Sequence, residues 1–153
     1  MASQKVKKQK YNNYTSIGWR EWIYLPKYDD FAMKAKVDTG ARTSALHAIH
    51  IKEYDCNGKK MVSFRLNQSN KQIDISTQLI RYLKITSSFG DSEIRPLIRL
   101  KIRLGERSWV TEVTLTKRTR MTYPMLIGRN TLMKRYLVLS HKSYLTGKNK
   151  LII

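Results

Sequence analysis

The stretch that decides the fold is Val37-Asp38-Thr39-Gly40-Ala41, which completes the apolar run Phe31–Val37. The pattern of that run predicts a β-strand. An Asp followed by a hydroxyl residue and a glycine can end a strand in a tight turn, with the carboxylate as a cap and the glycine at positive φ. The same residues can instead present a carboxylate for acid–base chemistry. A second motif is needed to choose between these interpretations.

That second motif lies near the end of the chain and reads Met125-Leu126-Ile127-Gly128-Arg129-Asn130. Two apolar residues before a glycine indicate a buried strand that ends where a short helix begins. In this order, the two motifs resemble those of the retropepsins, a group of aspartic proteases in which the second strand passes behind the catalytic loop. The resemblance implies that the catalytic residues are Asp38, Thr39 and Gly40, and that the residues supporting them are Leu126, Ile127, Gly128 and Arg129.

Only one Asp-Thr-Gly triplet occurs in the 153 residues. An aspartic mechanism needs two carboxylates that share a proton, one to activate water and one to donate a hydrogen bond to the scissile carbonyl. The second carboxylate must therefore come from a second chain. The sequence predicts a symmetric homodimer with its active site on the two-fold axis. By resemblance, Thr39 hydrogen-bonds across that dimer and Gly40 lets the substrate backbone approach.

Short apolar-alternating runs separated by polar turns predict a mostly β protein. Hairpin turns are expected at residues 57–58, 87–90 and 105–106, a helix at 128–135, and strands at 136–140 and 143–146. By resemblance, the fold is a closed retropepsin-like β-barrel with one short helix near the C-terminus. We expect residues 1–16 to form a flexible basic tail and residues 17–153 a single retropepsin-like domain.

A longer pattern narrows the resemblance to one bacterial group. It joins Trp19-Arg20-Glu21-Trp22, residues 36–48, Arg95-Pro96-Leu97-Ile98, residues 112–116 and the second motif. Together these segments resemble the retropepsin-like group catalogued as ATP-dependent zinc proteases, and the resemblance covers roughly residues 17–146. Some members of that group are associated with the ATP-dependent ligase that adds glutamate to a ribosomal protein.

The resemblance also implies substrate-binding residues. Retropepsins cover the substrate with a hairpin flap, to which residues 87–90 correspond. The residues expected to contact substrate are Ala41 and Arg42 in the loop and Ser88, Phe89 and Gly90 in the flap. Retroviral members carry an acid at the position of Arg42 and an arginine at that of Glu21. Two roles for Arg42 stay open: it binds acidic substrate side chains, or it pairs with Glu21 of the other chain.

The sequence gives little support for the zinc site that the group's name implies. A zinc hydrolase needs three well-spaced ligands. His47 and His50 lie three apart in a segment that is predicted to be extended, which would place them on opposite faces. We therefore expect no metal site and interpret His47 as a polar residue beside the catalytic strand. Residues 147–150 lack the spacing of a phosphate-binding loop, so no cofactor is expected.

The formal net charge is +19, with 30 Lys and Arg against 11 Asp and Glu. Such self-repulsion favours a polyanionic partner, for example ribosomal RNA or protein, although no RNA-binding motif is present. Cys56 is the only cysteine, which argues against a disulfide framework and suits a reducing compartment. The polar start and the lack of long apolar runs predict a cytoplasmic protein without a signal peptide or membrane span.

These observations converge on a homodimeric aspartic peptidase that cleaves acidic, glutamate-rich peptides or tails of ribosomal proteins. Two alternatives remain. One is a basic binding module with the same fold that tethers to RNA or the ribosome and cleaves nothing. The other is a zinc-dependent protease, as the name of the group states.

Overall fold

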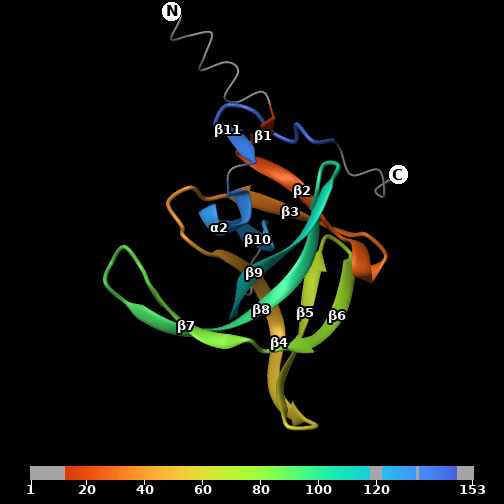
Figure 1. Cartoon of the computed structure of the whole chain (residues 1–153), viewed down its shortest axis with the longest axis vertical. Helices are drawn as coiled ribbons and strands as arrows, with labels where there is room; N and C mark the ends of the chain where they lie inside the picture. The colour runs from red at the N-terminus through yellow and green to blue at the C-terminus, as the bar shows by residue number, and fades with distance from the viewer. Residues whose placement is uncertain (1–12, 118–121, 134, 148–153) are drawn as a thin grey trace, which may run out of the picture.

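The computed structural model of the chain describes residues 13–117, 122–133 and 135–147. Figure 1 shows a body of strands with one short helix packed against it. The helices are the 3-10 turn η1 (Pro26–Tyr28) and α2 (Arg129–Leu132). The strands are β1 (Thr15–Gly18), β2 (Arg20–Leu25), β3 (Phe31–Val37), β4 (Ser44–Cys56), β5 (Lys59–Gln68), β6 (Lys71–Gln78), β7 (Arg81–Thr86), β8 (Ser92–Leu104), β9 (Arg107–Lys117), β10 (Met125–Ile127) and β11 (Tyr136–Leu139).

Six of the strands form a hydrogen-bonded ring. Its order is β10, β3, β2, β8, β9 and β4, and β4 pairs back with β10. Alternation along β8 explains how the ring encloses a core, since Leu100, Ile102 and Leu104 are buried while Arg99 and Lys101, which alternate with them, are exposed. The prediction of a mostly β protein with one short helix is therefore confirmed.

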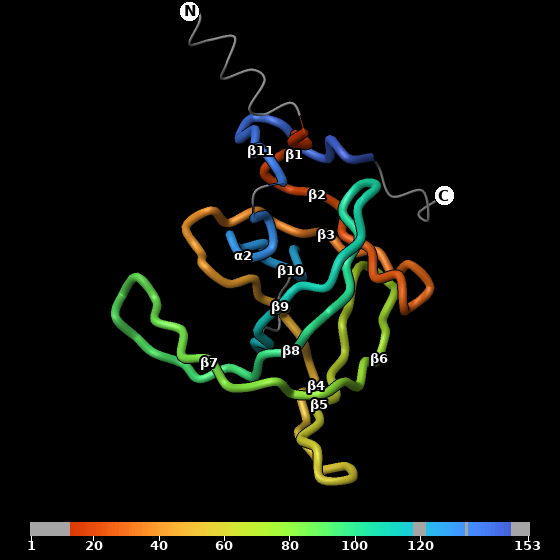
Figure 2. The backbone as a smooth tube through the Cα atoms, in the orientation of Figure 1, coloured from red at the N-terminus to blue at the C-terminus, as the bar shows by residue number. Residues whose placement is uncertain are grey.

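Two hairpins extend from this body as arms, as the tube in Figure 2 shows. The β4–β5 arm turns at Asn57 and Gly58, whose φ angles of 51° and 77° suit the tight turn predicted there. The β7–β8 arm turns at residues 87–91, where the Gly90 N–H donates to the Ser87 carbonyl at 3.0 Å. Both predicted arms are present, as is the β8–β9 hairpin around Gly105.

The ends of the chain differ from expectation. β1 begins at Thr15, inside the range predicted as a tail, and pairs in parallel with β11. Residues 1–12 of that predicted tail lie outside the described residues. α2 is shorter than the predicted helix because Met133 has a φ of 43° and ends it. The strand expected at residues 143–146 is wrong, because this segment forms turns against β2. None of the described helices could span a membrane.

Candidate active site

The catalytic loop predicted from the first motif begins where β3 ends. The Asp38 N–H donates to the Ile127 carbonyl of β10 at 2.9 Å, and β10 pairs in parallel with β3. The Asp38 carboxylate accepts the Gly40 N–H at 3.1 Å, so the aspartate also caps its own turn. Its side chain is half-buried, whereas Thr39 and Gly40 are exposed. The two interpretations of the motif are thus compatible: the turn presents the carboxylate at the surface.

The second motif holds the far side of this loop, here called the catalytic loop (residues 38–43). The backbone N–H groups of Arg129 and Asn130 donate to the carbonyls of Ala41 and Arg42 at 2.9 and 3.0 Å. The Arg129 guanidinium donates to the Thr39 carbonyl at 2.8 Å. The structure therefore brings the second motif against the catalytic loop, with Leu126 half-buried in the strand behind it.

Gly128 is required by close backbone approach. A Cβ atom at this position would lie 2.6 Å from the Thr43 carbonyl carbon and 2.9 Å from the Ser44 nitrogen. Real Cβ contacts are not this short, and backbone atoms cannot move aside as the end of a side chain can. The contact explains why a glycine follows the two apolar residues of the second motif.

A buried hydroxyl network, which sequence reasoning missed, supports the same junction. The Ser44 hydroxyl accepts the Gly128 N–H at 2.8 Å and also hydrogen-bonds to the Thr131 hydroxyl. Thr131 contacts the Thr111 hydroxyl at 2.8 Å, and Asn130 donates to the Glu112 carbonyl at 2.8 Å. Ser44 and Thr131 have no exposed surface. The only sequence signal is that hydroxyl residues lie close after both motifs, at Thr43 and Ser44 and at Thr131.

A cleft of about 520 Å³ lies beside the catalytic loop. One wall is the loop, from Gly40 to Thr43, and the other is β7, the stem of the β7–β8 arm. The lining residues of the stem are Arg81, Leu83, Lys84, Ile85 and Thr86.

The tip of the β7–β8 arm lies outside that lining. Ser88, Phe89 and Gly90, predicted as flap contacts, are all exposed, and the Phe89 side chain is 92% exposed. In Figure 1 the green arm extends on the same side as the orange catalytic loop. Its stem and not its tip thus borders the loop within one chain.

Glu21 is buried within its own chain, which rules out one of the two open roles of Arg42, pairing with Glu21 of the other chain. The Glu21 side chain is fully buried and accepts backbone N–H groups of Gly18, Leu145 and Thr146 at 2.6, 2.9 and 3.0 Å. It also accepts the Thr146 hydroxyl at 2.7 Å. This carboxylate anchors the segment after β11 to β2. Arg42, by contrast, is exposed at the cleft.

The histidines take different positions in β4. His47 is 3% exposed, and its backbone N–H donates to the Pro124 carbonyl at 2.7 Å. His50 is exposed and has a φ of 54°. Within the described part of the chain, no three His, Cys, Asp or Glu side chains are grouped so that they could hold a metal ion.

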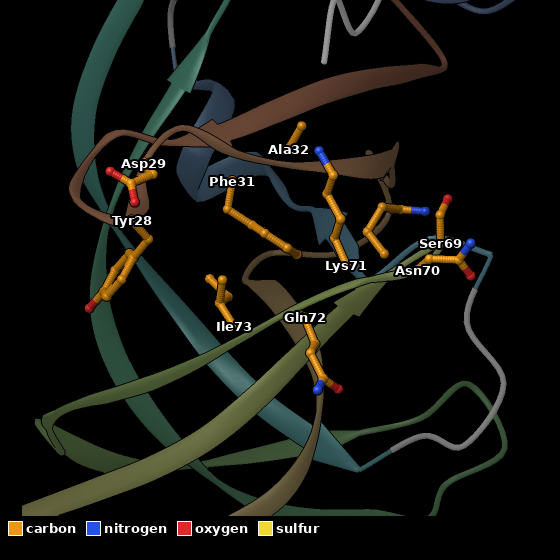
Figure 3. Close-up of a pocket in the computed structure, with 10 residues that line it drawn as sticks. Tyr28, Asp29, Phe31, Ala32, Ser69, Asn70, Lys71, Gln72 and Ile73 are labelled. Atoms are coloured by element: carbon orange, nitrogen blue, oxygen red, sulfur yellow. The ribbon is translucent and has the colours of Figure 1, made fainter. Parts of the chain in front are cut away.

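A larger pocket of about 660 Å³ lies away from the catalytic loop. Figure 3 shows its floor, where Phe31 and Ile73 point into the space between η1 and the β5–β6 turn. Its lining contains none of the residues of the two motifs. We therefore place the candidate active site at the smaller cleft, where the carboxylate of Asp38 lies next to the lining residues.

A family model described as "RimB-like: Retropepsin-like aspartic endopeptidase RimB" matches residues 16–149. Similar solved structures include the crystal structure of a DUF785 protein of unknown function from Legionella pneumophila. That structure has a TM-score of 0.75 and 27% identity, and the match covers 86% of this chain and 98% of that one.

Curated relatives are longer proteins. One named "Probable alpha-L-glutamate ligase" from Shewanella pealeana is 38% identical over 136 residues, which are 86% of this chain and 30% of the relative. Another of the same name from Desulfotalea psychrophila is 35% identical over 126 residues, which are 80% of this chain and 27% of the relative. The chain thus spans less than a third of the curated relatives it matches.

Proposed function

Because the chain belongs to the RimB-like family of retropepsin-like aspartic endopeptidases, we propose that it acts as a homodimer in which two Asp38 side chains form one catalytic dyad. The observation that carries the proposal is the geometry of the catalytic loop. Asp38 ends a buried strand, is half-buried itself, and is held by the second motif from behind. One chain offers one such carboxylate, so a second chain completes the pair.

The mechanism follows from two carboxylates held close together. They cannot both ionise at low cost, so the pair carries one shared proton. A water molecule lies between them. The ionised Asp38 takes a proton from this water as it attacks the peptide carbonyl, and the protonated one donates to the developing oxyanion. The carboxyl that took the proton of water then gives it to the amide nitrogen as the C–N bond breaks, and the other carboxylate recovers a proton from the tetrahedral intermediate as the carbonyl forms.

The exposed position of Thr39 beside Asp38 is consistent with a contact across the dimer axis. In this proposal the two catalytic loops meet at the axis and the β7–β8 arms cover the substrate on the other side. The six-stranded ring then serves as the closed barrel of a retropepsin-like subunit.

We propose acidic, glutamate-rich peptides as substrates, with the tails of ribosomal proteins as the physiological class. Relatives that contain a similar segment are named for glutamate ligation. Arg42 lines the cleft, and with Glu21 buried the role that stays open for it is binding acidic side chains of the substrate. The net charge of +19 would also concentrate acidic peptides around the protein.

The test is hydrolysis of a glutamate-rich peptide by the wild-type chain and by Asp38→Asn. The amide has the size of the carboxylate but cannot accept the proton of water, so turnover should fall by roughly 100-fold to 10,000-fold. Light scattering and circular dichroism should show the same dimer and fold. Undiminished turnover by a pure Asn variant would refute the aspartic mechanism. Loss of activity to a chelator, restored by zinc, would favour a zinc-dependent protease instead.

A second candidate function rests on charge. Arg99 and Lys101 lie exposed on the outer side of β8, within a chain of net charge +19. This favours association with a polyanion such as ribosomal RNA, either beside the peptidase activity or in its place. A wild-type chain that binds RNA with a steep salt dependence and cleaves no acidic peptide would select this function.

A further inference from the structure

The wall of the cleft opposite the catalytic loop carries a second guanidinium. Side chains along a strand alternate between two faces, so Arg81, Leu83 and Ile85 share one face of β7. All three line the cleft, as do Lys84 and Thr86 of the same strand and Arg42 on the other wall. The cleft is thus bordered by an arginine on each wall, and no acidic residue belongs to its lining.

Glu112 of β9 fixes the orientation of Arg81. Both terminal nitrogens of Arg81 donate to the Glu112 carboxylate, at 3.3 and 3.2 Å. The same carboxylate lies 3.6 Å from the Arg99 guanidinium, so one negative charge is shared between two positive ones. The Glu112 carbonyl in turn accepts the Asn130 side chain at 2.8 Å, which ties this group to the second motif.

The two arginines of the cleft therefore differ in how their side chains are held before a ligand binds. Arg42 is exposed and forms no ion pair within the described residues. Arg81 is held by a two-point contact with Glu112, so its side chain would lose little freedom when it binds a ligand. The cluster of Arg81, Arg99 and Glu112 keeps one excess positive charge. A guanidinium with a fixed plane and a remaining N–H group is well suited to bind a carboxylate.

We infer that Arg81 is a specificity-determining residue that binds an acidic side chain of the substrate, with Glu112 as its positioning residue. With Arg42 on the opposite wall, the cleft would bind a peptide that carries two carboxylates, one for each wall. The inference rests on the proposed function, because it takes the cleft as the substrate site. It differs from that function because it assigns acid selectivity to two of the three basic residues of the cleft, Arg42 and Arg81, and not to Lys84 or to the diffuse basic surface.

The experiment measures binding and not turnover, so that it stays informative if the peptidase function fails. Asp38→Asn protein is titrated into a fluorescent glutamate hexapeptide and its glutamine counterpart, and anisotropy gives each Kd. Adding Arg81→Gln should raise the Kd for the glutamate peptide by roughly 10-fold to 100-fold and leave the glutamine peptide nearly unchanged. Lack of hydrolysis by the wild-type chain would count against the proposed function alone.

The matched control is Arg65→Gln in the same background. Arg65 also makes a two-point contact with a carboxylate, that of Asp74, at 2.7 and 3.2 Å, but on the β5–β6 pair away from the cleft. The Arg65→Gln variant loses the same charge as Arg81→Gln and should change the Kd for the glutamate peptide less than two-fold. Equal weakening by Arg65→Gln and Arg81→Gln would overturn the inference, as would equal weakening of both peptides by Arg81→Gln.

Glu112→Gln separates orientation from charge. This change makes the protein more positive. If acid selectivity came from the overall positive charge, the variant would bind the glutamate peptide more tightly at low salt. If Glu112 positions Arg81, the preference for glutamate over glutamine should instead fall several-fold. A preference that rises would show that Glu112 does not position Arg81.

Discussion

The two walls of the cleft are built in opposite ways. The catalytic loop is held from behind by backbone hydrogen bonds with Ile127, Arg129 and Asn130 and by the buried Ser44–Thr131 network. The outer part of the β7–β8 arm pairs only with itself, and its residues from 86 to 94 are exposed. A segment with few buried contacts opens at low free energy, whereas a segment in a buried network does not. In the proposed function, the firmly held loop carries the catalytic carboxylate and the arm closes over substrate.

The largest effect should come from Gly128→Ala. The new Cβ would lie 2.6 Å from the Thr43 carbonyl carbon, so β10 and the catalytic loop would have to separate. We expect a loss of roughly 3 kcal/mol in the free energy of unfolding, measured by urea denaturation, and loss of hydrolysis. The control is Gly90→Ala in the arm, where a Cβ would meet nothing within 4 Å but φ is +89°.

Because that control adds only backbone strain, it should cost about 1 kcal/mol. If the two alanine variants lose similar stability, the catalytic loop is no more constrained than the arm, and the comparison fails.

The next effect should come from Thr131→Val, which keeps the shape and removes a fully buried hydroxyl. The Ser44 and Thr111 hydroxyls would each lose a partner, at a cost of about 1–3 kcal/mol in the free energy of unfolding. Thr86→Val on the exposed stem of the arm is the matched change and should stay within about 0.5 kcal/mol. Differential scanning calorimetry of both variants measures the contrast. Equal shifts in Tm would show that the buried hydroxyl network does not stabilise the catalytic loop more than an exposed hydroxyl stabilises the arm.

The smallest effect on stability should come from Phe89→Ala at the tip of the arm. The side chain is 92% exposed, so the free energy of unfolding should change by less than about 0.5 kcal/mol. If the arm closes over substrate, the ring becomes buried in the complex and KM should rise several-fold. Steady-state kinetics measures the effect on KM, and a denaturation curve measures the effect on stability. A stability loss as large as that of Thr131→Val would show that the tip is part of the folded body.

Short-range patterns accounted for what the sequence predicted correctly. The two motifs led to the family that the match over residues 16–149 now shows. The strand Phe31–Val37 and the turns at 57–58 and 105–106 follow from local alternation and turn residues, and the structure has them. These features depend on neighbours in the chain, which a sequence displays directly.

Contacts between distant residues explain what was missed. Glu21, between Arg20 and Trp22, has the sequence context of an exposed charge, but amide groups more than a hundred residues later make its burial possible. The orientation of the Arg81 side chain depends on Glu112 of another strand. The contact of the stem with the loop likewise depends on how β7 pairs with β8, and no local pattern encodes it.

The central claim is that each chain supplies half of one catalytic dyad at Asp38. Wild-type chain at fixed concentration should be mixed with increasing amounts of Asp38→Asn chain, allowed to exchange, and assayed on a glutamate-rich peptide. If the dyad is shared, the mutant should inhibit as it captures wild-type chains into inactive mixed dimers, and activity should approach zero at large excess. Activity that depends on the wild-type concentration alone, whatever the excess of mutant, would mean that each chain works by itself and would contradict the account.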